Sequence, residues 1–211
     1  MKELIKLVDS LRSQLAKNSM LTINTILENV HPKELDFLCD ILVPPLIKKA
    51  ADTNAFIGES AELALTTLCF NLSDGRVFAC LQNQVCRSKE TKVKVAMCYN
   101  TLIEKLGPRI RQFKDMERLI STVANFLNEG AIEVRNMAKM GLLSLKSSLG
   151  SQRELEAILA RCIPNDKQYE KVRQLIDRND LDSISNTGST RYGSSMRTSS
   201  LDSRSAGPHR Q

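Results

Sequence analysis

Tryptophan is absent from this 211-residue chain, histidine occurs only twice, and aromatic residues make up 4% of it. So few aromatic residues argue against a β-sandwich, which is rich in aromatic and β-branched runs. Nine glycines and six prolines are too few for many tight hairpins. The apolar residues are mostly Leu, Ile, Val, Ala and Met, which suit packing of helix on helix. The composition therefore predicts an all-α protein.

Side chains for catalysis are also scarce. His31 precedes a proline at a predicted helix boundary, and His209 lies near the end of the sequence. Neither histidine is well placed to form a catalytic His–Cys or His–Asp pair. Neither G-x-x-x-x-G-K-[ST] nor G-x-G-x-x-G occurs, so no phosphate-binding loop is indicated. We interpret acidic residues such as Glu59 and Asp115 as solvated helix faces. We expect a protein that is not an enzyme and uses no cofactor.

The six cysteines form no C-x-x-C pair, and most lie within apolar helical patterns. A free thiol in such a pattern packs as a small hydrophobic group. This pattern predicts reduced thiols, a cytosolic compartment and no zinc site. The N-terminal residues have no apolar signal core, and no run approaches the roughly 18 apolar residues of a membrane span. We therefore expect no membrane partner.

Two regions differ in composition. Residues 1–181 are apolar-rich and patterned, whereas residues 182–211 are mostly Ser, Thr, Gly and Arg. The second region has too little apolar surface to offset the entropy of ordering it, so we predict a disordered tail. Within it, Ser194 and Ser200 each follow an arginine by three residues. These serines are candidate phosphorylation sites, and phosphorylation would lower the positive charge of the tail.

Helical periodicity is nearly continuous in the first region. Pro32 suits a helix start. The Pro44–Pro45 pair is predicted to kink or split the helix that contains it. Val77, Cys80, Leu81 and Val85 predict a short helix. Gly107–Pro108 and Gly150 are predicted to end longer helices. Two more helices are expected at about 152–162 and 165–178.

The helices form a repeat when they are taken in pairs. Similar second helices begin at 54–57, 91–94 and 131–135, and a weaker copy begins at 11–14. Their spacing of roughly 40 residues is the period of HEAT and armadillo repeats. Because each pair in such an array packs only against its neighbours, the loops within pairs line one edge. The sequence thus predicts a HEAT/armadillo-like helical-repeat solenoid over 1–181.

The run TNAFIGESAELALTTLCFNLSDGRVFACL resembles a TOG domain of the CLASP and crescerin type. The later segments VKVAM and VRNMAK occupy equivalent places in the next two repeats, and the resemblance covers about residues 5–150. It implies a paddle-shaped HEAT array that binds tubulin along the loops within its helix pairs. TOG domains usually have six repeats and an exposed aromatic residue in the first. This chain matches the pattern from the second repeat onward and has no tryptophan.

The same resemblance implies the site. The tubulin-binding edge would comprise residues 11–14, 53–56, 89–94 and 131–135, with these candidate contacts: Ser13, Asn54, Ala55, Lys89, Lys92, Lys94 and Arg135. The charged candidates also have structural alternatives. The lysines could simply be the exposed start of a helix, and Arg135 could pair with a carboxylate of the neighbouring repeat. Phe56 and Ile57 are interpreted as core residues.

The net charge of +6 and the pI of about 9.1 permit an acidic partner. Our leading hypothesis is a tubulin- or microtubule-binding module that regulates microtubule dynamics or cilia, located at the cytoskeleton. The second is a general helical-repeat adaptor that holds a peptide or protein along its inner helices. The third, association with nucleic acid, is disfavoured because aromatic residues are few and no reader motif occurs.

Overall fold

The computed structural model describes residues 1–163 and 165–177. They fall in a compact unit that spans Met1–Asp180, and the second unit, Leu181–Gln211, lies outside them. The predicted tail and its candidate phosphorylation sites, Ser194 and Ser200, therefore also lie outside the described residues. Within the described ranges every regular element is a helix, as the composition predicted. No helix in these ranges is long and apolar enough to cross a membrane.

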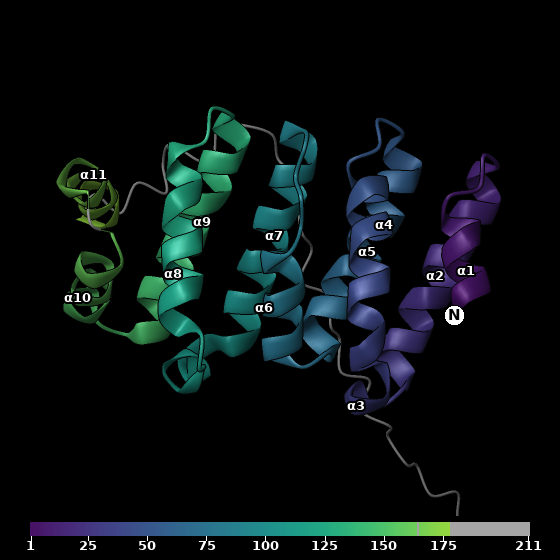
Figure 1. Ribbon diagram of the computed structural model, residues 1–211, viewed down its shortest axis with the longest axis horizontal. Coiled ribbons are helices and arrows are strands. Elements are labelled where there is room, and N and C mark those ends of the chain that lie inside the picture. Colours follow the sequence, from purple (N-terminus) through teal and green to yellow (C-terminus); the bar gives the residue numbers. More distant parts are fainter. Residues whose placement is uncertain (164, 178–211) are drawn as a thin grey trace, which may run out of the picture. The chain divides into compact units, whose positions relative to one another are not determined.

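The α-helices pair in sequence order (Figure 1). The pairs are α1 and α2, α4 and α5, α6 and α7, α8 and α9, and α10 and α11. Their bounds are α1 Lys2–Val8, α2 Ser13–Asn29, α3 Pro32–Leu35, α4 Cys39–Ala50, α5 Ala55–Asn71, α6 Asp74–Gln82, α7 Lys89–Leu106, α8 Met116–Asn125, α9 Ile132–Leu149, α10 Gln152–Cys162 and α11 Asp166–Asp177. Short 3-10 turns, η1 Asp36–Leu38, η2 Gly107–Gln112 and η3 Phe126–Asn128, complete the connections.

The second helices α2, α5, α7 and α9 pack against one another in that order. Their apolar faces supply much of one continuous core, whose largest fully buried side chains are Tyr99, Phe78, Met20, Ile23, Leu27, Leu42, Leu46, Leu65, Leu68, Leu72, Leu102 and Ile103. At about 25 cal/mol per Å² of apolar surface, this burial is the main force that holds the stack together. The predicted repeat architecture is confirmed.

Local signals at the helix ends explain most boundaries. Gly150 ends α9 in the left-handed conformation at φ 63°, where a side chain would be strained. Gly107 ends α7 at φ 47°. Ser88 begins α7 with a capping box, in which its side chain accepts from the Thr91 amide and the Thr91 side chain accepts from the Ser88 amide. Both predicted glycine ends are confirmed.

Two boundary predictions were wrong. Helix α4 runs through Pro44 and Pro45, and the break falls earlier, at η1. Packing of Leu42, Val43 and Leu46 in the core holds the helix although both prolines lack an N–H donor. Helix α6 ends at Gln82, so Val85 lies in the following loop and not on the helix.

Ion pairs join successive repeats on the first-helix side. Arg76 of α6 pairs with Asp40 of α4, and Arg161 of α10 pairs with Glu117 of α8 at 2.6 Å. All four side chains are more than 40% exposed, so each pair adds little to the free energy of unfolding.

The cysteines offer a simple check of the packing. Cys39, Cys69, Cys80 and Cys98 are buried, whereas Cys86 and Cys162 are half-buried, and burial raises the pKa of both half-buried thiols. Since the thiolate is the nucleophile, we expect Ellman's reagent to modify only these two in the folded protein, slowly at pH 7 and faster as the pH rises. Unfolding in guanidinium should expose the others. Rapid modification of more than two thiols in the folded protein would contradict this packing.

Candidate functional site

The loops within the first four helix pairs, from α1–α2 to α8–α9, reach the same edge of the stack, at the top of Figure 1. In the described part of the chain they are residues 9–12, 51–54, 83–88 and 129–131, each followed by the first turn of a second helix. We call these loops and first turns the loop edge. The edge coincides with the segments that the sequence singled out.

Ser13 and Ala55 begin α2 and α5, and both are exposed at the loop edge. Asn54 is the N-cap of α5, where its side-chain oxygen accepts from the Phe56 amide at 3.1 Å. An N-cap of this kind stabilises a helix by about 1 kcal/mol. Asn54 is therefore a capping residue, whatever else it contacts.

Lys92 and Lys94 bridge neighbouring repeats. The Lys92 Nζ lies 2.7 Å from a carboxylate oxygen of Glu129, and Lys94 pairs with Glu62 of α5. Their side chains are only 34% and 22% exposed. The interpretation of these lysines as an exposed helix start was therefore wrong. Lys89, at the first position of α7, is 64% exposed and is the outward-facing lysine of this turn.

Arg135 holds its own loop. Its Nη1 donates to the carbonyl oxygens of Glu129 at 2.8 Å and Gly130 at 2.6 Å. Among the described residues, the hydrogen bonds found for Arg135 go to these carbonyls, not to a carboxylate of the neighbouring repeat as the structural alternative proposed. Because Lys92 binds the Glu129 side chain and Arg135 binds its carbonyl, Glu129 connects the loops before α7 and α9.

Each of these loops, or the first helical turn that follows it, also presents an exposed apolar side chain. Leu11 is fully exposed, Val85 is 82% exposed, Ile132 is 54% exposed and Phe56 is 41% exposed. Both Phe56 and Ile57 were predicted to be core residues. The prediction was wrong for Phe56, which is exposed, and correct for Ile57, which is buried. The sequence pattern placed Val85 on the preceding helix, because its spacing continues the apolar pattern of that helix, and so did not identify it as an exposed loop residue. The polar Asn83–Gln84 pair before Val85 was the available sign that the helix had ended.

Cations flank these apolar residues. Arg12 follows Leu11, and Arg87 and Lys89 follow Val85, all of them exposed. Lys17 lies over the Phe56 ring, 3.8 Å from its centroid, a cation–π contact. Apolar side chains beside positive charges suit a protein surface that is acidic around apolar pockets.

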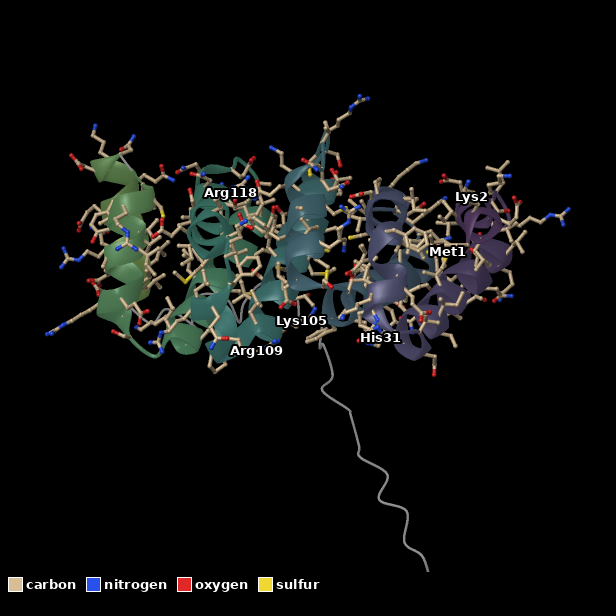
Figure 2. All side chains as sticks on the ribbon, turned by 60° about the horizontal axis from the view of Figure 1, so that its bottom comes forward. Met1, Lys2, His31, Lys105, Arg109 and Arg118 are labelled. Carbon is tan, nitrogen blue, oxygen red and sulfur yellow. The ribbon has the colours of Figure 1, made fainter. Side chains whose placement is uncertain are left out.

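Basic residues also occur on the opposite edge. Figure 2 shows His31, Lys105 and Arg109 there, in or beside the segments that connect successive repeats. Lys105 is tied to Asp74 at 2.6 Å, and Arg109 donates to the Lys105 carbonyl at 3.3 Å. Charge alone therefore does not single out the loop edge, and the opposite edge also has an exposed apolar residue, Phe37 of η1, which is 67% exposed. The loop edge differs in presenting such a residue in each of four successive repeats.

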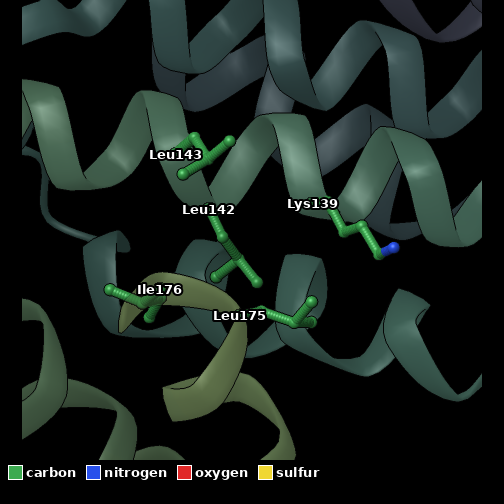
Figure 3. A pocket seen from close by; sticks show the side chains of 5 residues that line it. All are labelled: Lys139, Leu142, Leu143, Leu175 and Ile176. Atoms are coloured by element: carbon green, nitrogen blue, oxygen red, sulfur yellow. The ribbon is translucent and has the colours of Figure 1, made fainter. Parts of the chain in front are cut away.

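A small pocket lies between α9 and α11 (Figure 3). Leu142 and Leu143 of α9 face Leu175 and Ile176 of α11, and Lys139 is the single titratable residue among those that line it. Leu142 and Ile176 are each 1% exposed. The pocket is thus the seam through which α11 packs on the stack. The described residues contain no group of three or more potential metal ligands.

Comparison with known proteins identifies this architecture. The family model described as CLASP N terminal matches residues 1–165. The MAST/Orbit N-terminal domain superposes with a TM-score of 0.64 at 16% identity, over 85% of this chain and 79% of that one. A crescerin TOG domain, from an array that regulates microtubules in the primary cilium, superposes with a TM-score of 0.68 at 15% identity, over 84% and 73%. No curated protein sequence matches significantly. The predicted TOG fold is confirmed.

Proposed function

The chain belongs to the CLASP N-terminal family, and from this premise we propose that it is a non-enzymatic TOG module that binds tubulin or microtubules through its loop edge. The observation that carries the proposal is the row of exposed apolar side chains, one in each loop or in the first helical turn after it, beside exposed cations. The described structural relative from crescerin acts on microtubules, which supports the same class of partner.

The geometry divides the candidate residues into two roles. Leu11, Val85 and Ile132 are the apolar contacts that a partner would desolvate, and their burial would favour binding by about 25 cal/mol per Å² of apolar surface removed from water. Lys89 and its neighbour Arg87 would steer the module toward acidic tubulin and speed association. Ser13 and Ala55 are small, so they would let tubulin approach the first turns closely.

Lys92, Lys94 and Arg135 would act differently. Each already satisfies a carboxylate or carbonyl of the fold, so each contributes by holding the loops in position. In the cell, we propose, the module works at the cytoskeleton in the regulation of microtubule dynamics, including those of the cilium.

A charge and contact variant tests the loop edge. Val85→Ser combined with Lys89→Glu removes an anchor and opposes acidic tubulin with a like charge, so we expect at least about tenfold weaker binding, equivalent to about 1.4 kcal/mol. The melting temperature should not change, because both side chains are exposed. Cosedimentation with microtubules and gel filtration with free tubulin measure the two forms of binding.

Arg109→Glu is the matched control, since it reverses an exposed charge on the opposite edge. It should bind like the parent once the change in net charge is screened at physiological salt. If the control loses as much affinity as the double variant, binding follows net charge and the loop-edge proposal fails. Unchanged binding by a folded double variant would refute it equally.

A further inference from the structure

Four cysteines lie in one seam of the stack, between the α4–α5 pair and the α6–α7 pair. Cys39 and Cys80 belong to the first helices α4 and α6, whereas Cys69 and Cys98 belong to the second helices α5 and α7. All four thiols are free, and none of these side chains is more than 2% exposed. The first helices and the second helices of this seam thus each contribute one cysteine from either repeat.

Cys39 and Cys80 are in direct contact. The Cys80 Sγ lies 3.5 Å from the Cys39 carbonyl oxygen, and the Cys39 Sγ lies 4.0 Å from the carbonyl oxygen of Arg76, one turn before Cys80. The two thiols also share a hydrogen bond. Because a disulfide bond is about 2 Å long, sulfur atoms that are already in contact need only a small side-chain rotation to form it.

The two sulfur atoms differ in their surroundings. The hydrogen bond with the Cys39 thiol is the largest influence on Cys80 and lowers its pKa; Arg76 acts in the same direction, and burial and Asp40 oppose them. The same hydrogen bond, together with burial, raises the pKa of Cys39. Cys80 is therefore the sulfur that reacts as a thiolate, and Cys39 is the thiol that keeps its proton.

Gln84 lies against the Cys80 sulfur. Its Nε2 is 3.7 Å from the Cys80 Sγ and 2.9 Å from the Cys80 carbonyl oxygen, and an amide donor at this position favours the thiolate. Gln84 is half-buried in the loop after α6, where side chains change rotamer within nanoseconds. Hydrogen peroxide is small and neutral, so rotation of Gln84 lets it reach a sulfur from which the larger, charged Ellman's reagent is excluded.

Cys69 and Cys98 provide an internal comparison. Their thiols also share a hydrogen bond, which together with burial raises the pKa of Cys69 well above its usual value. They have the contact that a disulfide needs, but they lie between the second helices and are 1% exposed or less. We therefore expect this pair to react much more slowly than Cys39 and Cys80.

We propose that Cys39 and Cys80 form a reversible disulfide that ties the α4–α5 pair to the α6–α7 pair when the protein meets a peroxide. The Cys80 thiolate attacks one oxygen of hydrogen peroxide and the O–O bond breaks. The hydroxide that leaves takes up the proton released by Cys80, which gives a sulfenic acid and one water. The Cys39 sulfur then attacks the sulfenic sulfur, the S–O bond breaks, and the departing hydroxide takes the Cys39 proton to form a second water. Two thiols are thus oxidised by two electrons as one peroxide is reduced.

The bond would fix one seam of the stack. Repeats in a solenoid contact only their neighbours, so the relative position of the two pairs depends on this seam. The bond also closes a loop of about 40 residues in the unfolded chain and lowers its entropy. The melting temperature of the oxidised protein should therefore rise by at least about 5 °C. An excess of a small thiol should reverse the change by thiol–disulfide exchange, in which that thiol is itself oxidised to its disulfide.

The full chain with Cys86→Ser and Cys162→Ser is the protein to oxidise. It lacks the two half-buried thiols, so they neither consume the oxidant nor link two molecules. Trypsin then releases Cys39 and Cys80 in separate peptides with one cysteine each. After treatment with hydrogen peroxide, alkylation of the remaining thiols in denaturant and digestion without reductant, mass spectrometry should find these two peptides linked. Dithiothreitol should separate them.

Cys80→Ala should abolish both the link and the rise in melting temperature, whereas Cys69→Ala, the matched control, should keep both. Circular dichroism establishes that the variants fold, and the peptide map of the unsubstituted pair decides the question even if a core substitution prevents folding. The proposal is overturned if Cys39 and Cys80 stay reduced in the folded protein or link only after unfolding in guanidinium. It is also overturned if Cys69 and Cys98 link as readily, or if the melting temperature of the linked protein falls.

Discussion

Lys92→Glu combined with Lys94→Glu is expected to lower the free energy of unfolding by about 4 kcal/mol. Each change places two carboxylates together at a half-buried contact between repeats, opposite Glu129 and Glu62. Breaking a buried ion pair costs about 3–5 kcal/mol, and partial exposure reduces the cost of each one here. For a protein of this size the melting temperature should fall by about 10 °C, as measured by circular dichroism or calorimetry.

Charge exchange provides the control. Lys94→Glu with Glu62→Lys, and Lys92→Glu with Glu129→Lys, should each recover most of the lost stability, because the pair is restored with its partners exchanged. Lys89→Glu should not destabilise the fold, since Lys89 is exposed and the N-terminus of α7 favours negative charge. Weak tubulin binding by the Lys92 and Lys94 variant would thus report on the position of the loops and not on a lost contact. An unchanged melting temperature would contradict the structural role.

Gly141→Ala is expected to destabilise the fold by about 2 kcal/mol. A Cβ at Gly141 would lie 2.5 Å from the Asn100 Oδ1 and 3.0 Å from the Val123 Cγ1. Asn100 is 8% exposed, and its amide donates to the Met137 carbonyl at 3.0 Å, so moving it weakens a partly buried hydrogen bond. Overpacking costs typically about 1–3 kcal/mol, more than alanine gains over glycine in helix propensity.

A double-mutant cycle isolates this contact. Asn100→Ala removes the side chain that the new Cβ would meet, so Gly141→Ala should be clearly less damaging in that background. Urea unfolding of the four proteins measures the coupling. Gly75→Ala is the comparison, because nothing lies within 4 Å of a Cβ there and Gly75 is also helical. If Gly141→Ala and Gly75→Ala change the free energy of unfolding equally, the close approach of α7 and α9 does not depend on the glycine at position 141.

Local sequence signals predicted the repeat and most helix ends. Gly107 and Gly150 are backbone signals that act within a few residues, and the helical period of the core residues follows directly from burial on one face. The proline pair in α4 shows where local reasoning fails. Whether a helix continues through Pro44 and Pro45 depends on the packing of its neighbours, which the local sequence does not contain.

The position of the candidate site on one edge of the stack could be predicted, but the contacts of its side chains could not. The loop edge follows from repeat spacing, since every pair turns at the same level of the stack. The partners of Lys92 and Lys94 lie 37 and 32 residues away, in other repeats, so their pairing depends on tertiary contact. Spacing could not show that these lysines face inward while Lys89 faces outward. The exposure of Val85 was hidden for a similar reason, because one more apolar residue looks like one more helical turn.

The stacking of the repeats fixes the spacing between the loops of the loop edge. Each second helix lies beside the next, and packed helices are about 8–10 Å apart, so the loops before α2, α5, α7 and α9 span about 30 Å in steps of one repeat. A rigid partner must therefore match a length as well as a charge pattern. A change in the number of repeats would lengthen or shorten the row of loops by the width of one repeat. A change in one contact between repeats, such as Lys92–Glu129, would instead shift the loops on one side of that contact relative to those on the other.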